Sequence, residues 1–210
     1  VMRDHIGYEI TTYRIDGEYE DGRHPKEVVF TAELREDLRR RDFTINAMAY
    51  SHETGIVDIF GGAEDLAARR IRCVGDAGER FTEDALRILR AVRFSAQLGF
   101  SIEKKTWQAL CELAPSLVHV SKERVQVELT KTLLSDRPEF IWKTEAAGLA
   151  PYISKTFPEV FAAWKKRKSC AKQSLEEKVC SKNVPAADKD AIKTETVAQQ
   201  VHMFVKHECE

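Results

Sequence analysis

The hydrophobic pattern of the 210-residue chain changes at about residue 80. Before that point, short stretches rich in β-branched and aromatic residues alternate with turns and amphipathic helical patterns, which is typical of mixed α and β structure. After Phe81, apolar residues recur with helical spacing, and no stretch has the alternation of a convincing strand. The pattern therefore predicts an α+β protein whose strands lie in the first part and whose second part is helical.

The expected elements follow from these local patterns. We expect strands at residues 8–15, 27–31, 55–60 and 71–75, an extended segment from 42 to 51, and a mobile loop at 16–25. The segment 61–70 should form a turn followed by a helix. We expect further helices at residues 32–41, 82–98, 103–113, 122–134, 138–147 and 158–167. The stretch from 196 to 207 has an amphipathic pattern that suits packing against the rest.

Composition limits the functional classes. The chain is 43% hydrophobic and 32% charged with a net charge of −1, so a nucleic-acid partner must be bound by a local basic patch. The five cysteines are scattered and never form C-x-x-C, which indicates reduced thiols and a cytoplasmic protein. His202, His207 and Cys209 match no metal-site spacing. The basic run 165–168 suits a solvated helix end, with RNA contact as the alternative.

The segment "EDALRILRAVRF" (83–94) carries unusual charges. We expect Thr82 to cap the N-terminus of its helix and Gly99 to end it. Between Ala85 and Phe94 the only polar side chains are three arginines at a step of three residues, flanked by apolar residues on both sides: Arg87, Arg90 and Arg93. A sheltered row of guanidinium groups needs anionic partners. The alternative is a solvated helix face with a surface ion pair between Asp84 and Arg87.

Asp84 and Arg87 have the chemistry to read a nucleobase. Cytosine and adenine present an amine donor beside a ring-nitrogen acceptor, whereas guanine and uracil present a carbonyl acceptor beside an N–H donor. A carboxylate only accepts hydrogen bonds and a guanidinium only donates them. The pair therefore favours C and A over G and U, while Arg90 and Arg93 are placed for phosphate.

Two further segments carry candidate residues. In "RRRDFTINAMA" (39–49), Arg41 can bind a triphosphate, and Asp42 and Asn46 can bond ribose hydroxyls. A charged helix end with a local Asx turn explains each of these residues equally well. In "DIFGGAEDL" (58–66), a Gly pair precedes a helix, which by itself indicates only a tight turn.

The order and spacing of "RRDFTINAMAY", "DIFGGAEDL", "RCVG" and "EDALRILRAVRFSAQLGF" resemble the bacterial-type (class II) tRNA nucleotidyltransferase and poly(A) polymerase family. The resemblance extends from about Tyr8 to about Leu149, and "YEDGRHP" resembles the flexible active-site loop of that family. It implies CCA addition to tRNA 3′ ends from CTP and ATP. It also implies that Asp84 and Arg87 template the base, that Arg41 contacts the triphosphate, and that Arg90 and Arg93 contact the nucleotide. Asp42 and Asn46 match the ribose-recognising motif.

One departure from the family concerns catalysis. The Gly-rich turn and Asp-x-Asp pair that hold Mg²⁺ in the family belong upstream of "YEITTYR" and are absent, and the only such triplet, 188–190, lies in the polar tail. We therefore expect no catalytic or metal-binding residue in this chain, Mg²⁺ bound mainly by an N-terminal segment that it lacks, and no activity of the chain alone. Val1 is not an initiator Met, and we expect the chain to be part of a longer one.

The resemblance also implies a domain organisation. We expect the C-terminal part of a polymerase-beta-like nucleotidyltransferase head at 1–78, a helical neck or RNA-binding region with the templating helix at 79–148, and a partial or divergent helical body and tail at 149–210. The expected partners are tRNA, CTP and ATP, with no membrane. Two alternatives stay open: a poly(A) polymerase of the same family, and a non-catalytic nucleotide- or RNA-binding protein.

Overall fold

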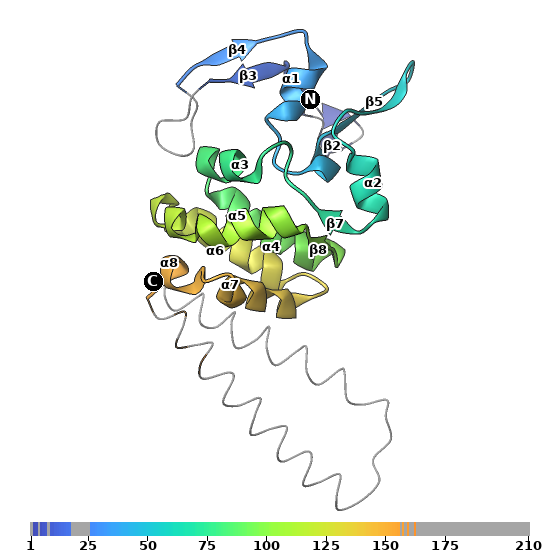
Figure 1. The fold of residues 1–210 in the computed structure, drawn as a ribbon. Helices are drawn as coiled ribbons and strands as arrows, with labels where there is room; N and C mark the ends of the chain where they lie inside the picture. The colour runs from blue at the N-terminus through green and yellow to red at the C-terminus, as the bar shows by residue number, and fades with distance from the viewer. Residues whose placement is uncertain are drawn as a thin grey trace, which may run out of the picture.

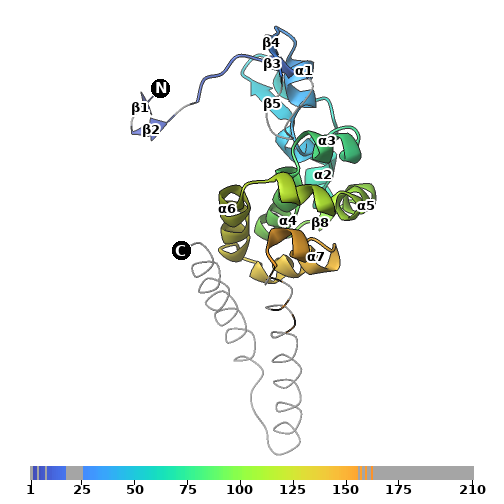
Figure 2. The same cartoon turned by 90° about the vertical axis from the view of Figure 1, so that its left-hand side faces the viewer.

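The computed structural model describes residues 2–3, 5–7, 9–17 and 26–155, together with the single positions 157, 159 and 162. The strands and short helices of the first part lie above a layer of helices formed by the second part (Figure 1). Two strands of two residues each, β1 (Met2–Arg3) and β2 (Ile6–Gly7), pair antiparallel near the N-terminus. This pair lies apart from the two parts just described (Figure 2). The α+β class is confirmed, as expected.

The next hairpin is shorter than the sequence predicts. β3 (Arg14–Asp16) pairs antiparallel with β4 (Val28–Phe30), with Ile15 opposite Val29, and α1 (Leu34–Arg39) follows. The strand expected over 8–15 is wrong at residues 9–12, which have no regular structure, whereas the Tyr13 carbonyl still accepts from the Thr31 N–H (3.0 Å) beside the hairpin. A strand forms only where its backbone groups find a partner, which local composition does not provide. Most of the loop expected at 16–25 lies outside the described residues.

The following segment has a second hairpin. β5 (Met48–Ser51) pairs with β6 (Gly55–Asp58), and α2 (Gly62–Ala67) and β7 (Arg70–Ile71) follow. The extended segment expected from 42 is wrong at its start, because residues Thr44–Asn46 form a 3-10 turn, η1. The Asp42 carboxylate accepts from the Phe43 N–H (2.8 Å) and from Asn46 Nδ2 (3.1 Å), and such side-chain bonds favour a turn over a strand.

The helix expected at 82–98 is divided between two helices. α3 (Ala77–Glu83) ends where Asp84 adopts an extended conformation (φ −146°, ψ 103°), and α4 begins at Leu86 and ends at Leu98. Thr82 is therefore not an N-cap; its hydroxyl donates to the Gly78 carbonyl inside α3. Gly99 ends α4 as predicted, with φ +67°, a left-handed conformation that glycine adopts without strain.

The second part is helical apart from one short strand. The expected helices at 103–113 and 122–134 are confirmed as α5 (Lys104–Glu112) and α6 (Lys122–Leu133). The remaining described helices are η2 (Ala114–His119), η3 (Pro138–Ile141), α7 (Trp142–Ala146) and α8 (Ala150–Ile153). The expectation that no strand follows residue 80 is wrong at β8 (Ser101–Ile102), which pairs in parallel with β7. The helix expected at 158–167, the basic run 165–168 and the final amphipathic stretch fall almost entirely outside the described residues.

One hydrophobic core joins the two parts. Phe43 and Ile71 from the first part and Phe81, Ile88 and Leu110 from the helices are fully buried in one cluster. α4 lies at its centre and packs along α6. The residues on either side of position 78 therefore share a core, and the three-domain division stays a prediction. Within the described part of the chain, no helix is long and apolar enough to span a bilayer.

Candidate nucleotide-binding site

Asp84 lies in the break between α3 and α4, where its side chain is fixed at both oxygens. Oδ1 accepts from the Leu86 N–H (3.0 Å), which makes Asp84 the capping side chain of α4. Oδ2 accepts from Nη2 of Arg124 on α6 (2.8 Å). Each carboxylate oxygen has two lone pairs, so the fixed carboxylate still has acceptor capacity for a ligand.

Arg87 does not pair with Asp84. Its Nη1 donates to Oε2 of Glu83 (2.5 Å) and to the Arg80 carbonyl (3.0 Å), and its Nη2 donates to the Arg40 carbonyl (3.0 Å). The surface ion pair between Asp84 and Arg87, which was the simpler explanation of the sequence, is therefore wrong. Arg87 instead connects the start of α4 to the end of α1, 47 positions earlier.

Arg90 connects α4 to the 39–49 segment, which carries Asp42 and Asn46. Its Nε (2.8 Å) and Nη2 (2.6 Å) both approach Oδ2 of Asp42, whose other oxygen binds Asn46. The structure thus brings together three of the residues singled out in the sequence, namely Asp42, Asn46 and Arg90. Asp42 is buried, whereas the Arg90 side chain is 34% exposed, so water reaches this ion pair from the arginine side.

Arg93 faces a different neighbour. Its Nε lies 2.6 Å from Oε2 of Glu128 on α6, and its guanidinium stacks over the Phe94 ring at 4.1 Å from the centroid. Arg93 is only 8% exposed. Six helical positions separate Arg87 from Arg93, which leaves the two side chains about 120° apart around the axis, so Arg93 faces α6 whereas Arg87 faces the end of α1. The expected contact of Arg93 with a nucleotide stays a prediction, and the structure gives it a protein carboxylate as partner.

Arg41 lines the cleft beside the end of α1. The cleft has a volume of about 750 Å³ and is formed by the segment before β3, the end of β4 and the end of α1. Its lining residues are Glu9, Ile10, Thr11, Thr12, Arg14, Phe30, Arg40 and Arg41. Only Arg41 among them is a site residue predicted from the sequence. The "TTYR" segment (11–14) is part of a predicted strand, although its hydroxyls and arginine are a signal for anion binding.

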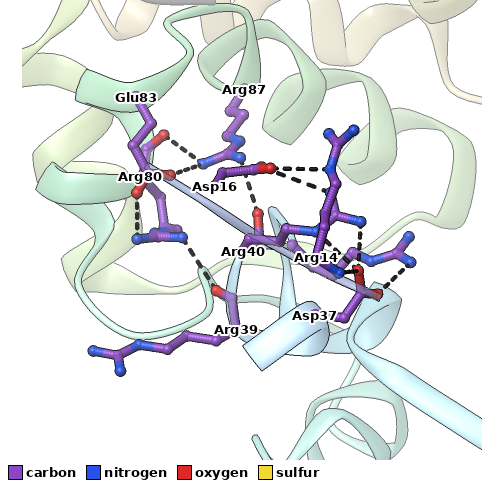
Figure 3. A network of polar contacts seen from close by, with 9 residues as sticks. Arg14, Asp16, Asp37, Arg39, Arg40, Arg80, Glu83 and Arg87 are labelled. Atoms are coloured by element: carbon purple, nitrogen blue, oxygen red, sulfur yellow. Dashed lines mark hydrogen bonds and ion pairs between the residues drawn. The ribbon is translucent and has the colours of Figure 1, made fainter. Parts of the chain in front are cut away.

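Two buried carboxylates hold the arginines of this cleft (Figure 3). Asp37 binds Arg40 (2.6 Å) and Arg41 (3.1 Å), and Asp16 binds Arg14 (2.9 Å). Burial by itself would raise the pKa of Asp37, but the hydrogen bonds from Arg40 and Arg41 outweigh it, and the pKa lies below its ordinary value. The carboxylate therefore stays charged and fixes the guanidinium groups at the wall of the cleft.

A third buried carboxylate, Asp65, supports the 42–46 segment from behind. Asp65, fully buried in α2, accepts from Thr44 Oγ1 (2.7 Å), Arg70 Nε (2.6 Å) and Arg72 Nε (2.7 Å). Gly62 approaches the same segment so closely that a Cβ would lie 2.3 Å from the Thr44 carbonyl oxygen. The Gly pair is therefore more than a turn, since its second residue allows α2 to pack against η1.

Comparison with known proteins yields two family matches in chain order. Residues 1–72 match the Poly A polymerase head domain, and residues 99–159 match the probable RNA and SrmB-binding site of polymerase A. The chain is 56% identical over 138 residues to the CCA-adding enzyme of Leuconostoc mesenteroides, and 52% identical over 160 residues to that of Anoxybacillus flavithermus. The chain belongs to the tRNA nucleotidyltransferase and poly(A) polymerase family.

Family members of known structure have the same fold. The Bacillus stearothermophilus CCA-adding enzyme in complex with CTP aligns with a TM-score of 0.66 at 41% identity, covering 73% of this chain and 37% of that one. The Thermotoga maritima CCA-adding enzyme complexed with tRNA aligns with a TM-score of 0.53 at 33% identity, covering 57% and 30%. The match to the Leuconostoc mesenteroides enzyme covers 65% of this chain and 34% of that enzyme. The match to the Anoxybacillus flavithermus enzyme covers 76% of this chain and 40% of that enzyme. The chain thus spans little more than a third of those relatives.

Phosphoryl transfer of the kind catalysed by nucleotidyltransferases depends on divalent metal ions held by clustered carboxylates. Among the described residues, no group of three or more His, Cys, Asp or Glu side chains is placed to hold a metal ion. Glu9 is the one carboxylate among the described residues that line the cleft, and Asp16 and Asp37 behind it are both bound by guanidinium groups. These residues do not fit Mg²⁺.

Proposed function

We propose that this chain is the nucleotide-selecting part of a tRNA nucleotidyltransferase that adds C, C and A to tRNA 3′ ends from CTP and ATP. The observation that carries the proposal is the position of Asp84 and Arg87 at one helix break. Each side chain is held by protein groups that leave it capacity for a further hydrogen bond. The Asp84 carboxylate accepts from the exocyclic amine of C or A, and Arg87 donates to the ring nitrogen.

Selection against G and U follows from the same geometry. Uracil and guanine would present a carbonyl oxygen to the Asp84 carboxylate and an N–H to the Arg87 guanidinium. Both contacts are repulsive, and neither group can reverse its role, because an ionised carboxylate has no proton and Arg stays protonated. A fixed, partly desolvated pair penalises such a mismatch by about 1–3 kcal/mol per unpaired group.

The rest of the nucleotide lies along the segment after α1. Arg41, whose side chain is 44% exposed at the cleft, contacts the triphosphate. Asp42 and Asn46 orient the ribose, with Arg90 holding Asp42 in place and contributing to the nucleotide contact together with Arg93. The match of residues 99–159 to an RNA-binding region supports tRNA as the second substrate. A cytoplasmic location suits this role.

Catalysis requires groups beyond those described. Mg²⁺ would supply charge neutralisation at the reacting phosphates, whereas the residues of this chain bind and orient the nucleotide. The single Asp-x-Asp of the sequence, at 188–190, lies outside the described residues. We therefore propose that the purified 210-residue chain binds nucleotides but does not incorporate CMP into a tRNA that lacks its CCA end.

A poly(A) polymerase is the second candidate, because the first family match is to a polymerase of that kind. Equilibrium dialysis of the chain with each labelled NTP separates the candidates. For CCA addition, CTP and ATP both bind at least about tenfold more tightly than UTP and GTP. Binding of ATP alone supports the poly(A) polymerase, and equal binding of all four NTPs contradicts base templating by this chain.

A further inference from the structure

Arg80 belongs to no motif of the sequence analysis, yet it contacts the residues around Arg87 on both sides (Figure 3). Its Nη1 donates to the Arg39 carbonyl (3.1 Å), and its Nη2 forms an ion pair with Oε1 of Glu83. Its own carbonyl accepts from Nη1 of Arg87. The Arg80 side chain is only 12% exposed, so water competes little with these contacts.

Glu83 lies between the two guanidinium groups. Oε1 binds Arg80 and Oε2 binds Arg87, so that one planar carboxylate is shared by both. Because the two oxygens are rigidly connected, the bond to Arg80 fixes the direction in which Oε2 meets Arg87. Without Arg80, Glu83 would be free to rotate, and its bond to Arg87 would no longer define a single orientation.

The end of α1 completes the arrangement. The last carbonyls of a helix have no partner within the helix, and here the Arg39 and Arg40 carbonyls accept from Arg80 and Arg87 respectively. Both arginines therefore bind consecutive residues of the segment that leads into Arg41 and Asp42. The orientation of the Arg87 guanidinium thus depends on its own bond to α1 and on the parallel bond that Arg80 makes beside it.

We infer that Arg80 is a positioning residue that sets base selectivity by fixing the guanidinium plane of Arg87 through Glu83 and the end of α1. The inference rests on the proposed function, in which Arg87 reads the ring nitrogen of the base. A guanidinium held at two nitrogens presents its remaining N–H groups in one direction, and such preorganisation is what discrimination between similar ligands requires. Arg80 itself does not touch the nucleotide.

The first test needs no nucleotide. In the ¹⁵N-labelled chain, the Arg87 side-chain signals are identified by their loss in Arg87→Lys. We expect separate Nη proton signals in the unsubstituted chain, because its bonds slow rotation about Cζ–Nη, and merged signals in Arg80→Gln. Arg70→Gln is the matched control, since it removes a guanidinium whose ion pairs are with Glu64 and the buried Asp65 of α2. Unchanged Arg87 signals in a folded Arg80→Gln chain would overturn the inference.

The second test measures selectivity. The ratio of the UTP to CTP dissociation constants should fall about fivefold in Arg80→Gln, which is the effect of one lost hydrogen bond, and stay constant in Arg70→Gln. Arg80→Lys keeps the charge but lacks the planar set of guanidinium donors, so its ratio should lie between those of Arg80→Gln and Arg70→Gln. Arg80→Lys replaces Arg80→Gln in the test if the latter does not fold. Affinity lost equally for CTP and UTP in both Arg80 variants contradicts the inference. An unsubstituted chain without CTP preference contradicts the proposed function instead, while the NMR result still tests the positioning.

Discussion

Arg124 on α6 donates from Nη2 to the Asp84 carboxylate over 2.8 Å, although the two residues are 40 positions apart. The carboxylate proposed to read the base is therefore bound by a helix of the region that matches an RNA-binding family. Asp84 is thereby fixed from two directions, by Arg124 at one oxygen and by the start of α4 at the other. Selectivity should therefore be a property of the α3–α4–α6 junction.

Replacement of Asp84 by Ala should loosen selectivity more than it weakens binding. The amine of C or A loses its acceptor, and the carbonyl of U or G no longer meets a carboxylate. Each effect is worth about 1–3 kcal/mol, so the preference for CTP over UTP should fall about tenfold or more. Equilibrium dialysis with the four NTPs measures the ratio. If all four NTPs lose affinity equally, the pair has a structural role only.

Replacement of Arg93 by Ala should act on stability first. The variant leaves the buried Glu128 carboxylate without its ion-pair partner, which typically costs about 3–5 kcal/mol. The double variant Arg93→Met/Glu128→Leu should recover most of that loss, because it removes both charges. Urea unfolding followed by circular dichroism gives the free energies. A small loss in Arg93→Ala, with equally weakened binding of all four NTPs, would instead favour a direct phosphate contact.

Gly62→Ala should destabilise the junction of α2 with η1. The new Cβ would lie 2.3 Å from the Thr44 carbonyl oxygen and 2.9 Å from its carbonyl carbon, both rigid backbone atoms. The cost should be about 1–3 kcal/mol from overpacking. Gly78→Ala in α3 is the matched control, since its nearest contact is a side-chain oxygen of Asp76 at 3.0 Å. Equal unfolding midpoints for the two variants would show that the backbone of Thr44 yields easily.

The free energy of unfolding should decrease in acid as the Asp37 carboxylate becomes protonated. Its folded-state pKa lies below the ordinary value, because hydrogen bonds from Arg40 and Arg41 outweigh the opposite effect of burial. The stabilisation is therefore fully present above the unfolded-state pKa of about 3.9, and it is lost as the pH falls through the lower folded-state pKa. In Asp37→Asn, stability at pH 7 should be lower and its decline below pH 4 shallower.

Urea midpoints measured from pH 7 to pH 3 test this expectation. Asp136→Asn, at an exposed carboxylate after α6, serves as the control and should follow the unsubstituted chain. Parallel curves for the unsubstituted chain and Asp37→Asn would show that the carboxylate is not the group responsible.

The sequence by itself determined the parts that depend on neighbouring residues. Apolar spacing located α5 and α6 to within two residues, and Gly99 ended α4 because only glycine adopts its φ of +67° without strain. The same local patterns indicated extended structure at β5 and β6, though not their pairing, and the change at residue 80. The motifs around Arg41 and Asp84 were also readable, because they are short runs of unusual residue types.

Tertiary structure alone decided the long-range partners of the charged residues. Arg90 meets Asp42 across 48 positions, and Arg87 meets the Arg40 carbonyl across 47, distances over which periodicity carries no information. Tertiary structure also decided the position of the helix break at Asp84. Arg124 on α6 binds the Asp84 carboxylate there, and the same side chain caps the next helix. The physical reason is that helix propensity is a sum of local terms of a few tenths of a kcal/mol, whereas a buried charge left without its partner costs about 3–5 kcal/mol and so outweighs several of them.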